Sequence, residues 1–230
     1  MMKHRTYSGK LLYLTDGVGE MGREWFKVTV HGDGSRTLRS LVEMDDDKLL
    51  RDVVITVGRD WKPLDAFVRL TINEEFVGTG WYRFSDTLVE CEAFTSASGR
   101  ASYRIPVAQR PPSLGAHPVC CDTWHTAAAF QVSQTPGTVL LPQVAMTSYL
   151  PNGGSGPELG MINLNVNYLG DEDLKVQAGT FSTRHFASLS THAPADRPPV
   201  EVWAFSDDFI PARLRWDLLG QTYELVELEH

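Results

Sequence analysis

The chain has 230 residues, of which 42% are hydrophobic and 22% are charged. This length and composition are typical of a globular protein with a sizeable core, and they exclude a disordered chain and a membrane-embedded one. The formal net charge of -8 at pH 7 argues against binding to nucleic acid or to an anionic membrane, which depends on basic surfaces. We predict one domain over residues 1–228.

No segment predicts export or insertion into a membrane. The apolar run at residues 11–14 is too short for the core of a signal peptide, and no run approaches the roughly 18 residues of a membrane helix. The three cysteines are odd in number and two of them, Cys120 and Cys121, are adjacent, so we expect reduced thiols in a cytoplasmic protein. Glu229 and His230 resemble the start of a vector-encoded purification tag.

The first hundred residues predict consecutive strands. Residues 25–30 alternate, with Phe26, Val28 and Val30 on one face, and the glycines of residues 31–35 suit a hairpin loop. Short strands with little helix between them indicate antiparallel neighbours. Further strands are expected at residues 37–43, 53–57, 66–72, 76–84, 87–94 and 101–107.

The middle of the chain predicts one helix. Pro118 suits the first helical position, and the alanine run that follows favours a helix to about Gln131. The glycine-rich residues 151–157 form either the rim or lid of a pocket or a plain long hairpin loop. Strands resume at residues 161–169, 174–188, 200–205, 212–218 and 221–228. The predicted fold class is all-β and mainly antiparallel: one large curved sheet, or half-open barrel, with one helix packed against it.

Several segments carry a family resemblance. Residues 168–186, which begin Tyr168-Leu169-Gly170, and residues 202–225, which include Val202-Trp203 and Ile210-Pro211, resemble bacterial β-clamshell proteins, mostly of families of unknown function. The His117-Pro118 pair and residues 154–157 are similar to the same group. The resemblance implies a curved antiparallel sheet with a ligand-sized concavity, and it implies no reaction.

One cluster has the composition of a metal site. On a helix, His117, Cys121 and His125 are four residues apart and share a face, and Cys120 lies beside them. The spacing matches no standard zinc signature, and free cysteine is commonly a buried core residue. We therefore predict no metal and no other cofactor; a reactive thiol is the remaining alternative.

Three residues are candidates for catalysis: His117, Asp122 and His185. A neutral histidine can take or give a proton near pH 7, and a nearby carboxylate can orient its ring. If the helix closes one mouth of the sheet, His117 and His185 would face the same cavity. The alternative is structural: His117 and Asp122 satisfy backbone groups at the start of the helix, and His185 is a hydrogen-bonded strand residue.

Arginine and tryptophan supply the candidates for ligand binding. Fifteen of the 21 basic residues are arginine, whose guanidinium group suits carboxylates, phosphates and aromatic rings. Six tryptophans offer flat apolar contact area. The alternative places the arginines on a polar solvent face and the tryptophans in the core. The candidate ligand-binding residues are Trp124, His125, Tyr168, Arg184, Trp203 and Arg215.

Two classes of function follow from these residues. The first is a cofactor-independent enzyme of the lyase, isomerase or dehydratase type, in which a histidine acts on an apolar or aromatic substrate. The second is a non-catalytic carrier or sensor of a hydrophobic ligand. An export signal would favour a carrier. Because the sequence shows none, we slightly prefer the enzyme. A structural subunit that forms a homodimer through a sheet edge is a third alternative.

Overall fold

The computed structural model describes residues 4–229. Within that range the chain forms fifteen β-strands, one α-helix and one short 3-10 helix. Of the two predicted tag residues, Glu229 is the last residue of a strand and His230 lies outside the described residues. No helix within residues 4–229 is both long and apolar enough to cross a lipid bilayer.

The elements fall into a group before the helix and a group after it. The first group is β1 (Arg5–Thr15), β2 (Gly19–Val30), β3 (Arg36–Met44), β4 (Leu49–Val57), β5 (Pro63–Ile72), β6 (Glu75–Phe84), β7 (Leu88–Thr95), β8 (Gly99–Pro106) and β9 (Leu114–Gly115). The helix α1 spans Val119–Val132. The second group is β10 (Gly137–Met146), β11 (Gly160–Val176), β12 (Gly179–Ser190), β13 (Val200–Phe205), β14 (Ile210–Trp216), the 3-10 helix η1 (Asp217–Leu219) and β15 (Gln221–Glu229).

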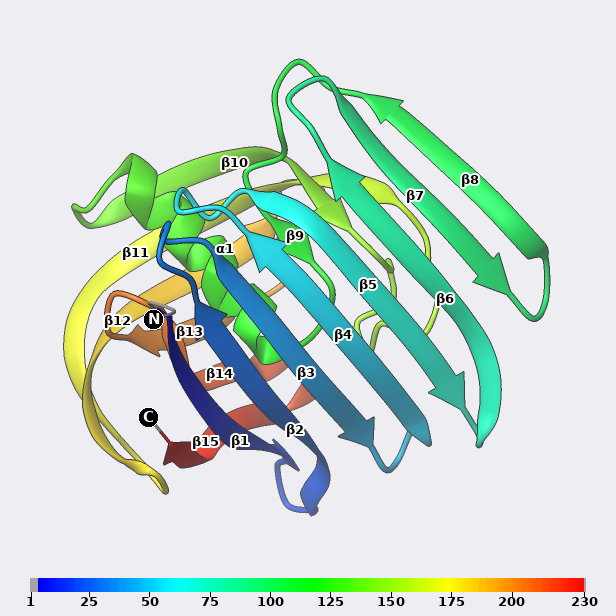
Figure 1. Cartoon of the computed structure of the whole chain (residues 1–230). Helices are drawn as coiled ribbons and strands as arrows, with labels where there is room; N and C mark the ends of the chain where they lie inside the picture. Colours follow the sequence, from blue (N-terminus) through cyan, green and yellow to red (C-terminus); the bar gives the residue numbers. More distant parts are fainter. Residues whose placement is uncertain (1–3, 230) are drawn as a thin grey trace.

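All fifteen strands belong to one sheet, which curves around the helix (Figure 1). The chain starts in the middle of the sheet at β1, runs outward strand by strand to β8, and crosses through β9 and α1. It then returns from β10 to β15, which pairs with β1 between Ser8 and Thr15. Only the short β9–β10 pair is parallel within residues 4–229, so the sheet is mainly antiparallel. The predicted fold class is confirmed.

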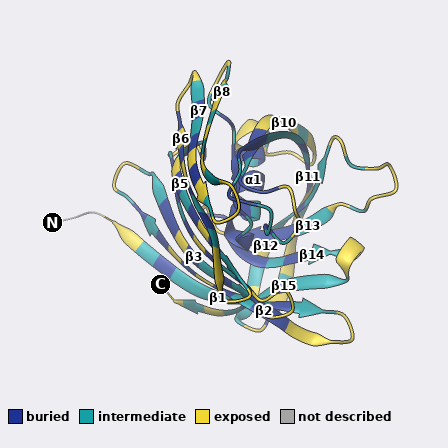
Figure 2. Ribbon diagram, turned by 90° about the vertical axis from the view of Figure 1, so that its right-hand side faces the viewer, coloured by how far each residue is buried: buried dark blue, intermediate teal, exposed yellow. Residues whose placement is uncertain are grey.

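Alternation along each strand produces the inner face of the sheet. In β4, the buried positions Leu49, Arg51, Val53 and Ile55 alternate with more exposed ones, because successive side chains of a strand point to opposite faces. Apolar residues of both groups of strands belong to one buried cluster, and Figure 2 shows buried positions in dark blue along the strands. One charged residue, Arg51, shares this buried face of β4.

Helix α1 lies inside the curve of the sheet and is buried along most of its length (Figures 1 and 2). Its buried residues do not form a single stripe, which is expected for a helix enclosed by other elements. Trp124 packs against Trp61 of the β4–β5 loop, with 5.9 Å between ring centroids, and the helix also contacts β9, β10, β11, β13 and β14. The helix therefore joins the two halves of the sheet.

Some strand boundaries differ from the sequence-based expectation. Strands β1 and β10 were not predicted, and β2 begins at Gly19, six residues before the expected start. Residues 170–173 were expected to separate two strands, but β11 continues through them to Val176, and the chain turns at residues 177–178, inside the expected strand 174–188. The reason is a bulge: the register with β12 shifts between Tyr168 and Gly170, whose φ of +128° favours glycine. This glycine bends the strand without ending it.

Candidate functional site

A cavity of about 370 Å³ lies beside the N-terminal end of α1. Strands from both groups form its walls, including Met44 of β3, Ile162 and Leu164 of β11, and Leu214 of β14. Cavities of this size that have mainly apolar walls and a few polar groups are typical of small-molecule sites. The polar or titratable side chains of its lining include Tyr13, Arg51, His117, Asp122 and His125.

The loop between β10 and β11 forms one rim of the cavity, through residues 149–152. It is held by its own hydrogen bonds, among them Ser148 Oγ to Ser155 Oγ at 2.6 Å. Pro157, at the end of the loop, packs closely on Gly78 and Gly80 of β6, where side chains would collide with it. The loop thus spans from the second group of strands to the first, and it agrees with the expectation of a pocket rim.

The start of α1 is capped by a residue far away in the sequence. Glu24 of β2 is fully buried, and its carboxyl group accepts the backbone N–H of Val119 at 2.7 Å. It also accepts the hydroxyl groups of Tyr13 at 2.9 Å and Ser40 at 3.0 Å. Burial raises the pKa of Glu24 above its usual value. The backbone group that we assigned to His117 or Asp122 is therefore satisfied by Glu24.

Asp122 lies in the first turn of α1 and lines the cavity. Burial, together with the nearby Glu24 carboxyl group, raises the pKa of Asp122 to about 7. A carboxyl group with this pKa exchanges its proton near neutral pH, which is the property required of a general acid or base.

His117 precedes the helix and also lines the cavity. Its φ of 74° is in the left-handed region, which few residues other than glycine adopt. The ring Nε2 lies 3.2 Å from the carbonyl oxygen of Ser148 in the rim loop. Burial and the nearby positive charge of Arg51 lower the pKa of His117 to about 3. The ring is therefore neutral at pH 7 and connects the helix start to the rim, which argues against His117 as a general acid.

His125 lies one helical turn after Asp122 and is buried. Its Nδ1 lies 2.5 Å from Ser113 Oγ, and burial lowers the pKa of His125 to about 4. The start of the helix thus brings His117, Asp122 and His125 to one cavity. The predicted helix face of His117, Cys121 and His125 does not form, because His117 precedes the helix and Cys121 does not line the cavity. Within residues 4–229, no three His, Cys, Asp or Glu side chains are arranged to hold a metal ion, and the three cysteines are free and buried.

Arg51 completes the polar part of the cavity, and we did not predict it. Its side chain is only 1% exposed, although it lines the cavity. The guanidinium group donates a hydrogen bond to the carbonyl oxygen of Asn152 in the rim loop. Among residues 4–229, no carboxylate lies within 4 Å of it. Burial lowers the pKa of Arg51 to about 10, so it remains charged at neutral pH.

Both Arg51 and Glu24 leave a signal in the sequence. Arg51 is two residues before Val53, in phase with the buried face of β4, and Glu24 is two residues before Phe26, in phase with the buried face of β2. A charged residue in phase with an apolar strand face is rarely buried without a partner or a role. Extending the alternating pattern by two residues toward the N-terminus of each strand would identify both residues.

His185 lies elsewhere, so the expectation that it shares a cavity with His117 is not met. On β12 its ring stacks on Trp203 at 4.1 Å between centroids, and Nδ1 lies 3.0 Å from a carboxylate oxygen of Glu172. The same Glu172 oxygen accepts the indole N–H of Trp203 at 2.6 Å. Burial lowers the pKa of His185, against the opposing effect of Glu172 and Glu201. This arrangement matches the structural alternative for His185.

Three more candidates also have structural partners. Trp124 packs on Trp61 in the core. The hydroxyl of Tyr168 donates to Asp171 at 2.7 Å. Arg215 is paired with two aspartates, and the distance to Asp16 is 2.7 Å. Neither these residues nor Trp203 line the cavity beside the start of α1.

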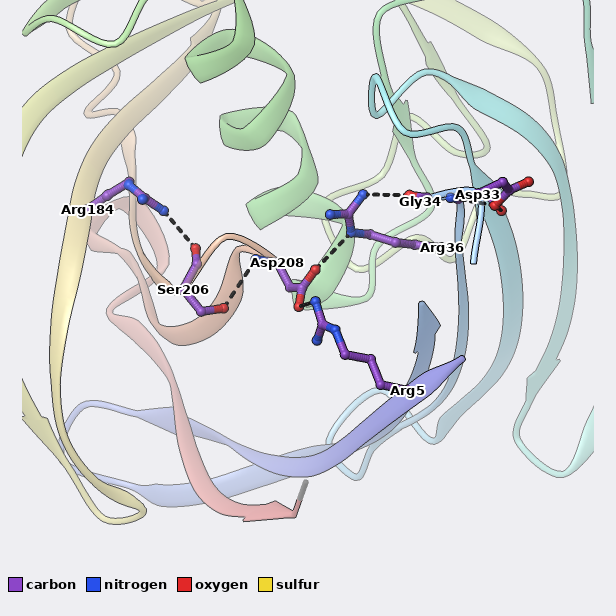
Figure 3. Close-up of polar contacts among 8 residues, drawn as sticks. Arg5, Asp33, Gly34, Arg36, Arg184, Ser206 and Asp208 are labelled. Carbon is purple, nitrogen blue, oxygen red and sulfur yellow. Dashed lines mark hydrogen bonds and ion pairs between the residues drawn. The ribbon is translucent and has the colours of Figure 1, made fainter. Parts of the chain in front are cut away.

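Arg184 lines a second cavity, of about 530 Å³, at the C-terminal end of α1. Its guanidinium group lies over the ring of Phe130, 4.8 Å from the centroid, and donates to the carbonyl oxygen of Ser206 at 2.7 Å. Figure 3 shows Arg184 approaching from one side and Arg36 and Arg5 converging on Asp208 from the other. Arg36 is 3.1 Å from Asp208, so at this end of the helix each of these arginines has a local partner.

Comparison with known proteins gives the fold but no activity. No protein-family model matches the chain, and no curated protein matches it in sequence. A solved structure, the β-barrel-like protein of domain of unknown function DUF1849 from Brucella abortus, has a TM-score of 0.56 and 12% identity. It covers 100% of this chain and 98% of its own. A DUF1089 family protein from Pseudomonas aeruginosa has a TM-score of 0.48 and 7% identity over 82% of this chain and 87% of its own.

The first of these likenesses confirms the predicted resemblance to barrel-like proteins of unknown function, at the level of the fold.

Proposed function

We propose that this protein binds a small, mainly apolar molecule in the cavity beside the N-terminal end of α1. The observation that carries the proposal is the cavity itself: about 370 Å³ with apolar walls from both groups of strands and several titratable side chains at the start of the helix. Apolar walls supply most of the affinity for such a ligand, and a few fixed polar groups orient it.

The condition of the two histidines favours binding over catalysis by histidine. His117 is tied to the rim loop and His125 to Ser113, and burial lowers the pKa of both rings far below 7. A general base works best when its pKa is near the operating pH. We therefore place the carrier or sensor, our second hypothesis from the sequence, ahead of the histidine-dependent enzyme.

One observation supports an enzyme as the second candidate. Asp122 lines the cavity, and burial raises its pKa to about 7, so it can exchange a proton with a bound molecule. An isomerase or lyase that needs one acid or base and no cofactor would fit this arrangement. In that case Asp122, rather than a histidine, transfers the proton.

A titration with a neutral fluorescent probe tests the proposed function. N-phenyl-1-naphthylamine becomes bright in apolar surroundings, and we expect it to bind the protein saturably at one site. The variant Ile162→Trp places a larger ring in the cavity wall and is expected to weaken probe binding at least about tenfold.

The matched control is Leu140→Trp, which adds the same ring to an exposed position of the neighbouring strand β10. Its probe affinity should equal that of the wild type. Equal binding by Ile162→Trp and the wild type, or no saturable binding by either, would show that the cavity is not a ligand site.

A further inference from the structure

We infer that the ligand of this cavity carries a carboxylate group that pairs with Arg51, so that the protein takes small amphipathic carboxylates. The inference rests on the proposed function and adds the chemical class of the ligand. It is drawn from the burial of Arg51, from its lack of a carboxylate partner, and from the surroundings of its guanidinium group.

The position of Arg51 is unusual for a charged side chain. It lies in the middle of β4, on the same buried face as Leu49, Val53 and Ile55, and only 1% of it is exposed. Moving a charge out of water costs several kcal/mol unless a partner compensates it. The carbonyl oxygen of Asn152 satisfies one hydrogen bond but brings no negative charge.

The acidic groups around Arg51 do not compensate it. The groups whose negative charge would raise the pKa of Arg51 are Tyr13, Cys121, Glu24 and Asp47. Burial raises the pKa of Tyr13 and Cys121 well above their usual values, which favours their uncharged forms. Burial also raises the pKa of Glu24, which is occupied by three other donors. Asp47 is in an exposed turn, where water screens it.

The rim loop holds the guanidinium group in place at the cavity. Gly153 approaches Arg51 so closely that a side chain would collide with the guanidinium and with the ring of His117. Its φ of +72° also favours glycine. A fixed guanidinium loses little freedom when it binds a carboxylate, and it offers two parallel N–H groups to the two oxygens.

The charge of the cavity favours a monoanion with an apolar body. One buried guanidinium balances one negative charge, whereas a phosphate with two charges would leave a surplus inside an apolar enclosure. The other arginine of the cavity lining, Arg197, is exposed, so water screens its charge. Asp122 shares the cavity, and its raised pKa keeps it mostly protonated below about pH 7. The apolar walls accept the rest of the molecule.

The test compares octanoate with 1-octanol, which has the same chain and no charge. The affinity of each compound is measured by its displacement of N-phenyl-1-naphthylamine from the wild-type protein. The assay is run at about pH 6, where octanoate is ionised and Asp122 is mostly protonated. We expect octanoate to bind roughly tenfold to hundredfold more tightly than octanol, because a charge-assisted hydrogen bond to Arg51 forms only with the carboxylate. Equal affinities of the two in the wild type would overturn the inference while leaving the proposed function intact.

Two substitutions assign the preference to one side chain. Arg51→Met should remove the preference for octanoate and keep the affinity for octanol, and Arg51→Lys should keep part of the preference because the charge remains. The control is Arg197→Met, an exposed arginine that also lines the cavity, and we expect its preference to be unchanged. If Arg197→Met loses the preference and Arg51→Met retains it, Arg51 is not the carboxylate site.

The failures of the two proposals are distinct. If neither the neutral probe nor octanol nor octanoate binds, the cavity is not a binding site and the proposed function fails. If the probe and octanol bind but octanoate binds no better, only the carboxylate inference fails. Because the wild-type comparison needs no variant, the inference stays testable even if Arg51→Met does not fold.

Discussion

The two ends of helix α1 differ in whether a buried arginine is paired with a carboxylate. At the C-terminal end, Arg36 lies 3.1 Å from Asp208 and stacks over Trp61, 3.9 Å from the ring centroid. At the N-terminal end, Arg51 faces a cavity with no carboxylate within 4 Å among residues 4–229. A paired arginine is explained by the fold that it holds together. An unpaired buried arginine is better explained by a ligand.

The positive charge of Arg51 opposes the helix dipole, whereas other charged groups at the two ends follow it. The Glu24 carboxyl group binds the first free N–H of the helix, and the guanidinium groups of Arg36 and Arg184 lie near its last turn, which has no basic residue of its own. Negative groups near the start of a helix and positive groups near its end are stabilising. The comparison predicts that Glu24 and Asp208 stabilise the fold, whereas Arg51 contributes little to it.

The largest effect on stability is expected from Glu24→Ala. The substitution leaves the buried donors of Tyr13, Ser40 and Val119 without an acceptor and removes the cap of α1. We expect the free energy of unfolding to fall by about 3–4 kcal/mol, measured by denaturant titration. Glu24→Gln keeps an acceptor oxygen and should cost much less. Equal losses in the two variants would contradict the role of hydrogen bonding.

Asp208→Asn breaks the charge pairing at the other end of the helix. Asp208 is buried and pairs with Arg36, which is mostly buried, and with Arg5, which is mostly exposed. We expect a loss of about 2–3 kcal/mol in the free energy of unfolding, because Arg36 loses its partner while Arg5 remains in water. Asp207→Asn changes a neighbouring but exposed aspartate and should have almost no effect. A similar loss in both variants would mean that burial does not matter here.

Asp122→Asn should change the dependence of stability on pH. Burial raises the pKa of Asp122 to about 7, so between about pH 4 and pH 7 the folded state keeps a proton that the unfolded chain has released. Stability therefore falls as the pH rises through this window. At pH 8 we expect Asp122→Asn to be more stable than the wild type by about 1–2 kcal/mol, since partial exposure to the cavity reduces the effect. At pH 4 the two should be nearly equal, and a constant difference at every pH would exclude this explanation.

The smallest effect on stability is expected from Arg51→Met, which sharpens the contrast between the two ends. Replacing an unpaired buried charge with an apolar side chain of similar length removes a desolvation cost along with a hydrogen bond. We expect the free energy of unfolding to change by less than about 1 kcal/mol without ligand. Melting curves with and without octanoate measure this, and the shift caused by octanoate should disappear in the variant. A loss as large as that of Asp208→Asn would make Arg51 a structural residue.

The cavity residues were predictable where they lie close together in the sequence. Asp122 and His125 are three residues apart on α1, so helical geometry brings them to the same side, and His117 lies just before the start of that helix. Arg51 and Glu24 lie just before the predicted strand segments, which begin at Val53 and Trp25. Only the longer strands β4 and β2 put them on the buried face. His185 has no such local rule: whether it meets His117 depends on the curvature of the sheet, which no segment encodes by itself.

Strand alternation, the place of the helix and the antiparallel class could be predicted from local patterns, because side-chain period, proline and glycine act over a few residues. Long-range contacts could not: β1 pairs with β15 and so joins the two groups of strands, Glu24 caps a helix 95 residues away, and Asn152 meets Arg51. These contacts depend on how fifteen strands twist around one helix, a property of the whole sheet rather than of any segment.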